Sequence, residues 1–276
     1  MPLTGSKQPK PWLSWNRRVS VKKIATRTAY GQTLARLGEE DQNIVVLDAD
    51  LSKSTKTADF AKKFPERFFN AGIAEANLMG MAAGLAAAGK IPFASTFAVF
   101  ATGRGFEQIR NSIAYPKLNV KIAATHAGIS VGEDGGSHQS VEDVSLMRSL
   151  PNMTVVVPAD AVETSKVIEA AVKYQGPMYI RLGRLDLPVI LPEDYEFQLG
   201  KAVVLREGRD AAVFANGLMV GLALEAAEQL SQAGIEIAVV NAATVKPLDI
   251  DTVVEVARLT GAVVTAEEHS IIGGLG

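Results

Sequence analysis

Short runs of aliphatic and β-branched residues alternate along this chain with longer segments of helical length. The runs 44–47, 120–124 and 155–157 are bounded by polar residues, glycine or proline, as strands buried in a parallel sheet are. The segments between them that have helical length and composition are 27–37, 73–88, 105–113 and 161–174. This alternation predicts an α/β fold in which helices wind on both faces of a mainly parallel sheet.

The same alternation restarts after a turn-rich connector that contains Pro188 and Pro192. The strands and helices expected beyond it are 211–215, 218–232, 235–240, 250–259 and 262–265. The units that we expect are an N-terminal arm at 1–22, a larger unit at 23–190 and a smaller α/β unit at 196–276. A glycine-rich loop follows the last strand without a helix to cover it, so we expect the smaller unit to be truncated.

Composition excludes several classes of protein. The net charge of −2 gives no electrostatic footprint for nucleic acid or an anionic membrane. The absence of cysteine removes disulfides and thiolate chemistry and fits a cytoplasmic location. The longest apolar stretch, 73–88, is shorter than the ~20 residues of a membrane span and predicts a buried helix. The basic residues near the N-terminus, which we expect to be solvated, are Lys7, Lys10, Arg17, Arg18, Lys22 and Lys23.

A glycine-rich segment, 124–143, carries His126 and His138 and begins where a predicted strand ends. Ligands of open parallel sheets bind beyond the carboxyl ends of the strands, so this loop is a candidate site. A surface loop whose histidines cap neighbouring helices is the alternative. Adjacent acids such as Glu133 and Asp134 have no fixed ligand geometry, so we expect no metal site on this chain.

A second candidate is the start of the helix at 73–88. We expect Asn70 to be its N-cap and Glu75 to lie in its first turns, where a carboxylate is favoured by the helix dipole. Gly80 and Gly84 follow at a spacing that lets a backbone or a flat ligand approach closely. Glu75 therefore either favours the helix start or lies beside an interface.

Five motifs occur in order along the chain: Gly72-Ile-Ala-Glu75, Ser95-Thr-Phe97-x-x-Phe100, Thr125-His126, Gly132-Glu-Asp-Gly-x-x-His138-Gln and Glu267-Glu-His269. Together they resemble the thiamine-diphosphate-dependent transketolase family, specifically its pyrimidine-binding domain followed by part of its C-terminal domain. The resemblance implies a transferase of the pentose phosphate pathway, which moves a two-carbon ketol unit between sugar phosphates. It covers most of the chain.

The resemblance also implies roles for individual residues. Glu75 matches the glutamate bound to N1′ of the aminopyrimidine, which promotes the imino tautomer that deprotonates C2 of the thiazolium. Phe97 and Phe100 match residues that hold the pyrimidine ring, although two phenylalanines at this spacing also suit a core. Asp50 matches a residue close to the cofactor.

Two further sets of residues match the part of the family's site that binds sugar. One set matches groups that hydrogen-bond to sugar hydroxyls, where proton transfer accompanies carbon–carbon cleavage. This set is His126, Asp134 and His138. Those that match groups bonded to the terminal phosphate are Arg27, Ser54 and Arg184, with Arg181 competing for the place of Arg184. His269 is expected to be a loop cap.

The chain departs from the family at two points. Gly103 stands where a tyrosine is common, and the Gly-Asp-Gly element followed by Asn-Asn, which anchors Mg²⁺ or Ca²⁺ and the diphosphate, is absent. The resemblance therefore implies the C-terminal subunit of a split transketolase. A separate N-terminal subunit would hold the metal and the diphosphate, and the assembly would be an α2β2 heterotetramer. The helix that contains Gly80 and Gly84 would be its contact surface.

Three alternatives stay open. A β subunit of a 2-oxoacid dehydrogenase would not need a sugar-hydroxyl set such as His126, Asp134 and His138. Deoxyxylulose-phosphate synthase normally carries an arginine in place of Phe100. An inactive regulatory module would be favoured by loss of Glu75 or of the histidines, and none of these residues is lost.

Overall fold

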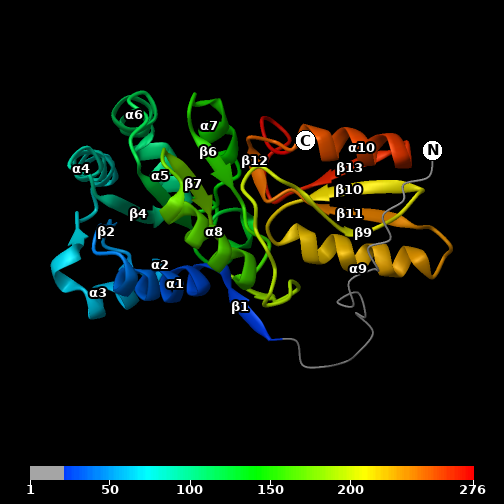
Figure 1. Cartoon of the computed structure of the whole chain (residues 1–276), viewed down its shortest axis with the longest axis horizontal. Helices are drawn as coiled ribbons and strands as arrows, with labels where there is room; N and C mark the ends of the chain where they lie inside the picture. Colours follow the sequence, from blue (N-terminus) through cyan, green and yellow to red (C-terminus); the bar gives the residue numbers. More distant parts are fainter. Residues whose placement is uncertain (1–21) are drawn as a thin grey trace.

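Two sheets with helices on both faces form most of the molecule (Figure 1). The structure, a computed structural model, describes residues 22–276, so the arm expected at 1–22 lies outside the described residues except for Lys22. The observed architecture confirms the α/β class, with a large parallel sheet followed by a smaller α/β unit. No helix among the described residues is long and apolar enough to cross a membrane.

The larger sheet has seven strands in the order β12-β6-β7-β5-β4-β2-β3. In chain order they are β2 (Ile44–Asp48), β3 (Phe68–Asn70), β4 (Ile91–Phe97), β5 (Lys121–Thr125), β6 (Thr154–Val156), β7 (Met178–Arg181) and β12 (Thr244–Lys246). All neighbours are parallel except β12, which comes from the second half of the chain and pairs antiparallel with β6. Every residue of β2 and β5 is buried, as a strand covered on both faces requires.

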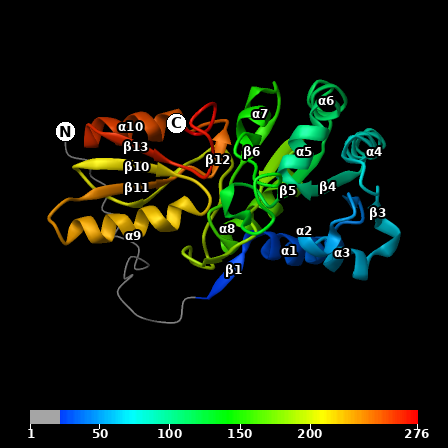
Figure 2. The same cartoon turned by 180° about the vertical axis from the view of Figure 1, so that it is seen from behind.

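Helices cover both faces of this sheet (Figure 2). Those on one face are α1 (Thr26–Glu40), α3 (Ala58–Lys63) and α8 (Ala161–Lys173), whose apolar side chains form one core cluster with the strands. Those on the other are α4 (Glu75–Ala87), α5 (Ala98–Arg104), α6 (Phe106–Gln108), the π-helical η3 (Ile109–Ala114) and α7 (Asp143–Ser149). The short elements α2 (Ser52–Thr55), η2 (Pro65–Arg67) and η4 (Ile129–Val131) lie in the connections.

The smaller sheet has four strands in the order β13-β10-β11-β9. They are β9 (Val203–Arg206), β10 (Ala211–Ala215), β11 (Ile237–Asn241) and β13 (Val263–Ala266), with β9 antiparallel to β11. Helix α9 (Met219–Ser231) and helix α10 (Ile250–Thr260) pack on opposite faces of this sheet (Figure 1). A separate two-stranded pair, β1 (Lys23–Ala25) with β8 (Asp186–Pro188), joins the start of the larger unit to its end.

The helix that carries Glu75 starts differently from the expectation. Helix α4 begins at Glu75 rather than at residue 73, and the preceding residue, Ala74, offers no side-chain cap. Asn70 is not its N-cap: it ends β3, and its Oδ1 accepts a hydrogen bond of 2.9 Å from the Gly72 backbone N–H. The positive φ of Gly72, 71°, allows this turn before the helix starts. The segment expected to be one helix at 105–113 is split between α6 and η3.

Candidate functional site

Most of the site residues identified in the sequence lie at one edge of the larger sheet. Asp50 follows β2, Phe97 ends β4, His126 follows β5 and Arg184 follows β7. These strands are parallel neighbours in the order β7-β5-β4-β2, so their carboxyl ends meet at the same edge. This is the edge at which open α/β sheets bind ligands.

Aromatic rings form one wall of the site. The ring of Phe97 stacks on His126 with 3.8 Å between the ring centroids, and Phe100 lies 5.8 Å from Phe97. His138 meets Phe100 edge-on at 5.2 Å, which brings the second histidine of the glycine-rich loop onto the same wall. Aromatic rings gathered in this way suit contact with a planar aromatic ligand.

Glu75 lies beside this wall with only 4% of its surface exposed. Its Oε1 accepts a 3.0 Å hydrogen bond from Nη1 of Arg104. The guanidinium of Arg104 also lies 4.3 Å from the centroid of the Phe100 ring, in a cation–π contact. A buried carboxylate and an aromatic face are therefore linked through one side chain.

Arg104 was not identified from the sequence. It follows Phe100 by four residues on α5, the spacing at which helical side chains meet. That spacing could have indicated the contact with Phe100. Nothing local indicates the contact with Glu75, because the two residues are 29 positions apart.

The environment of His126 holds its imidazole neutral. The pKa of His126 is lowered to about 3, mainly by burial and in addition by the charges of Arg27 and Arg184. Nη1 of Arg27 lies 3.3 Å from His126 Nε2, and the hydroxyl of Thr125 lies 2.8 Å from Nδ1. Since arginine only donates, Nε2 is the acceptor and Nδ1 carries the proton.

Arg27 lies between two partners at the start of α1. Its Nη1 donates to the Ser54 carbonyl at 2.8 Å as well as to His126, so Ser54 contributes its backbone to this contact. Burial, followed by the charge of Arg184, lowers the pKa of Arg27. The charges of Asp186 and Asp134 act in the opposite direction, so the Arg27 guanidinium lies among groups of both signs.

Arg184 and Arg181 have different environments. Arg184 donates to the Val131 carbonyl and to the Glu133 carboxylate, and it lies 3.9 Å from Oδ2 of Asp134. Arg181 is buried and forms an ion pair with Asp143, with 2.8 Å between Nε and Oδ2. The geometry therefore favours Arg184 over Arg181 for contact with a ligand.

The remaining expectations concern Asp50 and metal ions. Asp50 pairs with Asn70 across the ends of β2 and β3, with 2.9 Å between Asn70 Nδ2 and Asp50 Oδ1. No contact within residues 22–276 joins Asp50 directly to the aromatic wall. Across the same residues, no group of three or more histidine, cysteine or acidic side chains is placed to hold a metal ion.

Comparison with known proteins identifies matches to both units. The family model described as the pyrimidine-binding domain of transketolase matches residues 22–189, and that of the transketolase C-terminal domain matches residues 200–276. A Methanocaldococcus jannaschii protein described as a transketolase C-terminal section is 54% identical over 252 residues, which are 91% of this chain and 79% of that protein.

Two further matches are described as a transketolase subunit and as a split gene transketolase. A 6-deoxy-6-sulfo-D-fructose transketolase subunit from Clostridium sp. (strain MSTE9) is 46% identical over 250 residues, covering 91% of this chain and 78% of the relative. A solved structure described as a split gene transketolase, an inactive beta4 tetramer, is 63% identical with a TM-score of 0.85, covering 91% of this chain and 82% of that one.

Proposed function

Because the chain belongs to the transketolase family, we propose that it is the C-terminal subunit of a split, thiamine-diphosphate-dependent transketolase. The reaction proposed is transfer of a two-carbon ketol unit from a ketose phosphate to an aldose phosphate. The observation that carries the proposal is the buried Glu75 carboxylate, linked through Arg104 to the face of Phe100. Membership of the family implies thiamine diphosphate as the cofactor. The sugar phosphates and the separate N-terminal subunit are part of the proposal.

The residues present fit the aminopyrimidine end of the cofactor. A carboxyl group with 4% exposure can hold a proton shared with a ring nitrogen, and the Phe97 and Phe100 rings can orient the heterocycle. When bound, thiamine diphosphate supplies an electron sink for carbon–carbon cleavage. The chain's own contribution is to orient the ring, to exclude water around Glu75 and to hold one proton there.

The other side chains of the site fit a sugar phosphate. The neutral imidazole of His126 can exchange hydrogen bonds with a hydroxyl group, and His138 and Asp134 are on the same loop. Arg27 and Arg184 can bind phosphate oxygens in pairs. For Arg184 this requires exchange of its contact with Glu133, an exposed carboxylate that gives up a partner to water at little cost.

We assign the small-residue face of α4 to the partner subunit. Glu75 begins the buried face of this helix. A Cβ atom built at Gly80 or Gly84 would have no other atom within 4 Å, so the face that carries these two glycines is open. The helix lies at the outer end of the larger unit (Figure 1). An N-terminal subunit docked on this face would bring its diphosphate and its Mg²⁺ or Ca²⁺ toward Glu75, in a cytoplasmic α2β2 assembly.

The test is reconstitution with an N-terminal transketolase subunit. We expect this chain alone to bind thiamine diphosphate weakly in calorimetry, and the mixture with Mg²⁺ to bind it tightly and to transfer ketol units. Glu75→Gln should assemble and lose turnover, whereas Glu107→Gln, a change of an exposed acid on α6, should keep it. Full-strength binding by the single chain, or an undiminished rate with Glu75→Gln, would contradict the proposal.

A further inference from the structure

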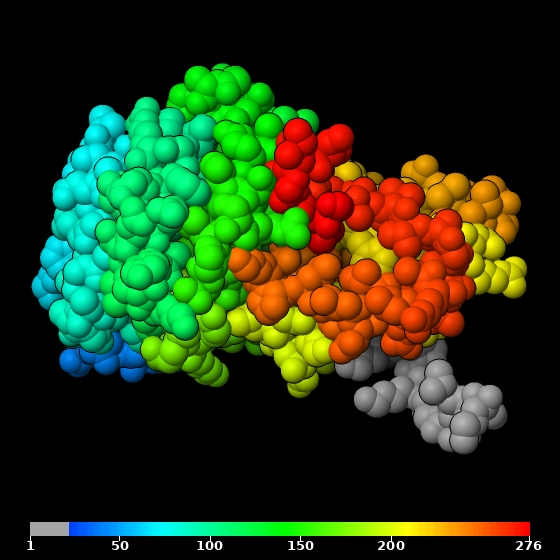
Figure 3. Space-filling model, turned by 90° about the horizontal axis from the view of Figure 1, so that it is seen from above, coloured from blue at the N-terminus to red at the C-terminus, as the bar shows by residue number. Residues whose placement is uncertain are grey.

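The loop after β13 packs against the loop that carries the site histidines. The Ser270 N–H donates to the Val141 carbonyl at 2.8 Å, and the Ser145 N–H lies 3.4 Å from Nε2 of His269. Figure 3 shows the C-terminal segment, in red, against the green segment that contains these residues. The smaller unit therefore contacts the site loop directly, and His269 is part of that contact rather than a cap of its own loop alone.

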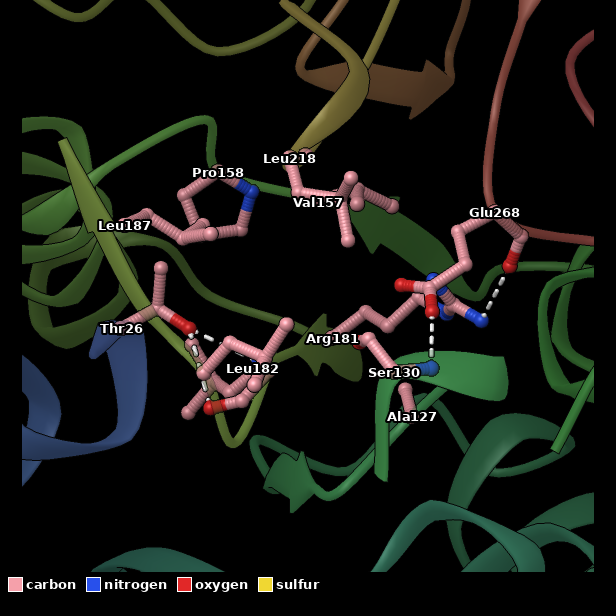
Figure 4. Close-up of a pocket in the computed structure, with 13 residues that line it drawn as sticks. Thr26, Ala127, Ser130, Val157, Pro158, Arg181, Leu182, Leu187, Leu218 and Glu268 are labelled. Carbon is pink, nitrogen blue, oxygen red and sulfur yellow. Dashed lines mark hydrogen bonds between the residues drawn. The ribbon is translucent and has the colours of Figure 1, made fainter. Parts of the chain in front are cut away.

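Glu268 makes the central contacts of this interface (Figure 4). Its side-chain Oε1 accepts a hydrogen bond from the Ser130 backbone N–H. Its backbone carbonyl accepts a 2.9 Å hydrogen bond from Nη2 of Arg181. Arg181 is held by the buried ion pair with Asp143, so Glu268 is attached to a fixed part of the larger unit.

The backbone at Gly128 is shaped to admit this carboxylate. A Cβ added at Gly128 would lie 2.2 Å from the Glu268 carboxyl carbon, closer than real side chains approach. Gly128 also has a φ of 82°, which glycine adopts without strain. A small cavity of about 30 Å³ remains beside Glu268, Ser130 and Arg181, so little space separates the two units here.

The site loop, residues 128–138, is largely exposed, and its other side-chain contacts include those of Arg184 with Val131 and Glu133 and that of His138 with Phe100. Residues 132–134 and 136–137 are exposed, and Gly128, Gly132 and Gly135 all have positive φ. Ordering such a segment on ligand binding costs backbone entropy, and glycine loses the most. A contact that orders the loop beforehand reduces that cost when a ligand binds.

We propose that Glu268 is a positioning residue that holds the loop 128–138, and with it Asp134 and His138, in the conformation that binds substrate. The smaller unit thereby contributes to substrate affinity without touching the substrate. This inference rests on the proposed function for the identity of the ligand. The contact between Glu268 and Ser130 can be tested without any turnover.

The first measurement is amide hydrogen exchange on the isolated full chain. Glu268→Ala should speed exchange of the 128–138 segment by about tenfold or more, since loss of one acceptor frees the Ser130 N–H. Glu268→Gln keeps an oxygen acceptor and should exchange like the wild type. Glu267→Ala is the matched control, because Glu267 accepts from Leu275 and Gly276 instead of from the site loop.

The second measurement is steady-state kinetics of the reconstituted complex. Glu268→Ala should raise KM for the sugar phosphates about tenfold with kcat nearly unchanged, and Glu268→Gln should restore KM. Equal exchange in Glu268→Ala and Glu267→Ala, or an unchanged KM despite faster exchange, would overturn the inference. A wild-type complex without turnover would contradict the proposed function, whereas the exchange comparison would still decide whether Glu268 holds the loop.

Discussion

The carboxylate of Glu75 and the guanidinium of Arg104 form an ion pair of 3.0 Å in which one partner is buried and the other is exposed. The side chain of Glu75 is 4% exposed and that of Arg104 is 54% exposed. The acceptor therefore lies inside the site, and the donor reaches it from the surface across the Phe100 ring. Arg104 restricts Glu75 to one orientation at the place where we propose that the pyrimidine binds.

Removal of Arg104 tests the importance of this orientation. In the reconstituted complex, Arg104→Ala should raise the Kd for thiamine diphosphate about tenfold, because Glu75 must then be ordered by the ligand itself. Arg104→Lys should give a smaller effect, since an ammonium group keeps the charge but loses the planar stacking on Phe100. Calorimetry on the two variants measures both effects. Unchanged binding by Arg104→Ala would contradict the orienting role of Arg104, and tighter binding would show that Arg104 competes with the cofactor for Glu75.

The central strands of the larger sheet could be predicted from the sequence because they are buried on both faces. Runs such as 44–47 and 120–124 consist of residues that a covered parallel strand requires, so local composition was sufficient. The start of α4 could not be predicted in the same way. Asn70 suits a helix cap chemically, but the observed turn at Gly72 directs its side chain back to Asp50 instead.

The contacts that complete the site are set by tertiary packing. Arg104 meets Glu75 across 29 positions, and Glu268 meets Ser130 across 138 positions. Neither pairing has a periodicity in the sequence, because each depends on how helices and loops pack on the finished sheets. The motifs located His126, His138, Phe97 and Phe100, and the parallel strand order explains why they lie together.

The neutral state of His126 gives a spectroscopic prediction. With the pKa lowered to about 3, the imidazole should stay uncharged from pH 8 down to pH 5. Its Hε1 resonance, assigned by its loss in His126→Asn, should therefore not shift across this range in the isolated chain. A midpoint near pH 6.5 for that resonance would contradict the burial and the acceptor role of Nε2.

Arg184 and Arg181 should respond differently to removal. Arg184→Ala should raise KM for a phosphorylated acceptor about tenfold more than for its unphosphorylated analogue, with the thermal midpoint nearly unchanged. Kinetics on this acceptor pair measures the difference. Equal effects on the two acceptors would assign Arg184 to a structural role.

Arg181→Ala should act on stability instead. Its loss leaves the Asp143 carboxylate buried without its ion-pair partner, which costs about 3–5 kcal/mol. Denaturant unfolding of the isolated chain measures this free energy. A variant as stable as Arg184→Ala would mean that the buried pair contributes little to the fold.

Glu163 links the two units and gives a pH-dependent stability. Its Oε1 accepts hydrogen bonds from the Tyr195 hydroxyl at 2.9 Å and from Asn241 Nδ2 at 2.8 Å, so α8 is joined to the connector and to β11. Burial is the main cause that raises the pKa of Glu163 to about 7. The folded chain therefore holds this proton at pH values where the unfolded chain has released it.

The sign of the effect follows from this proton. The stabilisation from Glu163 is fully present below 4.5, the ordinary pKa of a glutamate in the unfolded chain, and is lost as pH rises through about 7. A shift of this size corresponds to roughly 3 kcal/mol. Burial of His126 acts in the opposite direction, because its stabilisation is lost as pH falls below 6.5 toward 3.

Denaturant unfolding of the wild type and of Glu163→Gln separates the contribution of Glu163 from that of His126, since the contribution of His126 cancels in the difference between the two proteins. Between pH 5 and pH 8 the wild type should lose stability relative to the variant. A constant difference would show that Glu163 is ionised in the folded chain throughout this range.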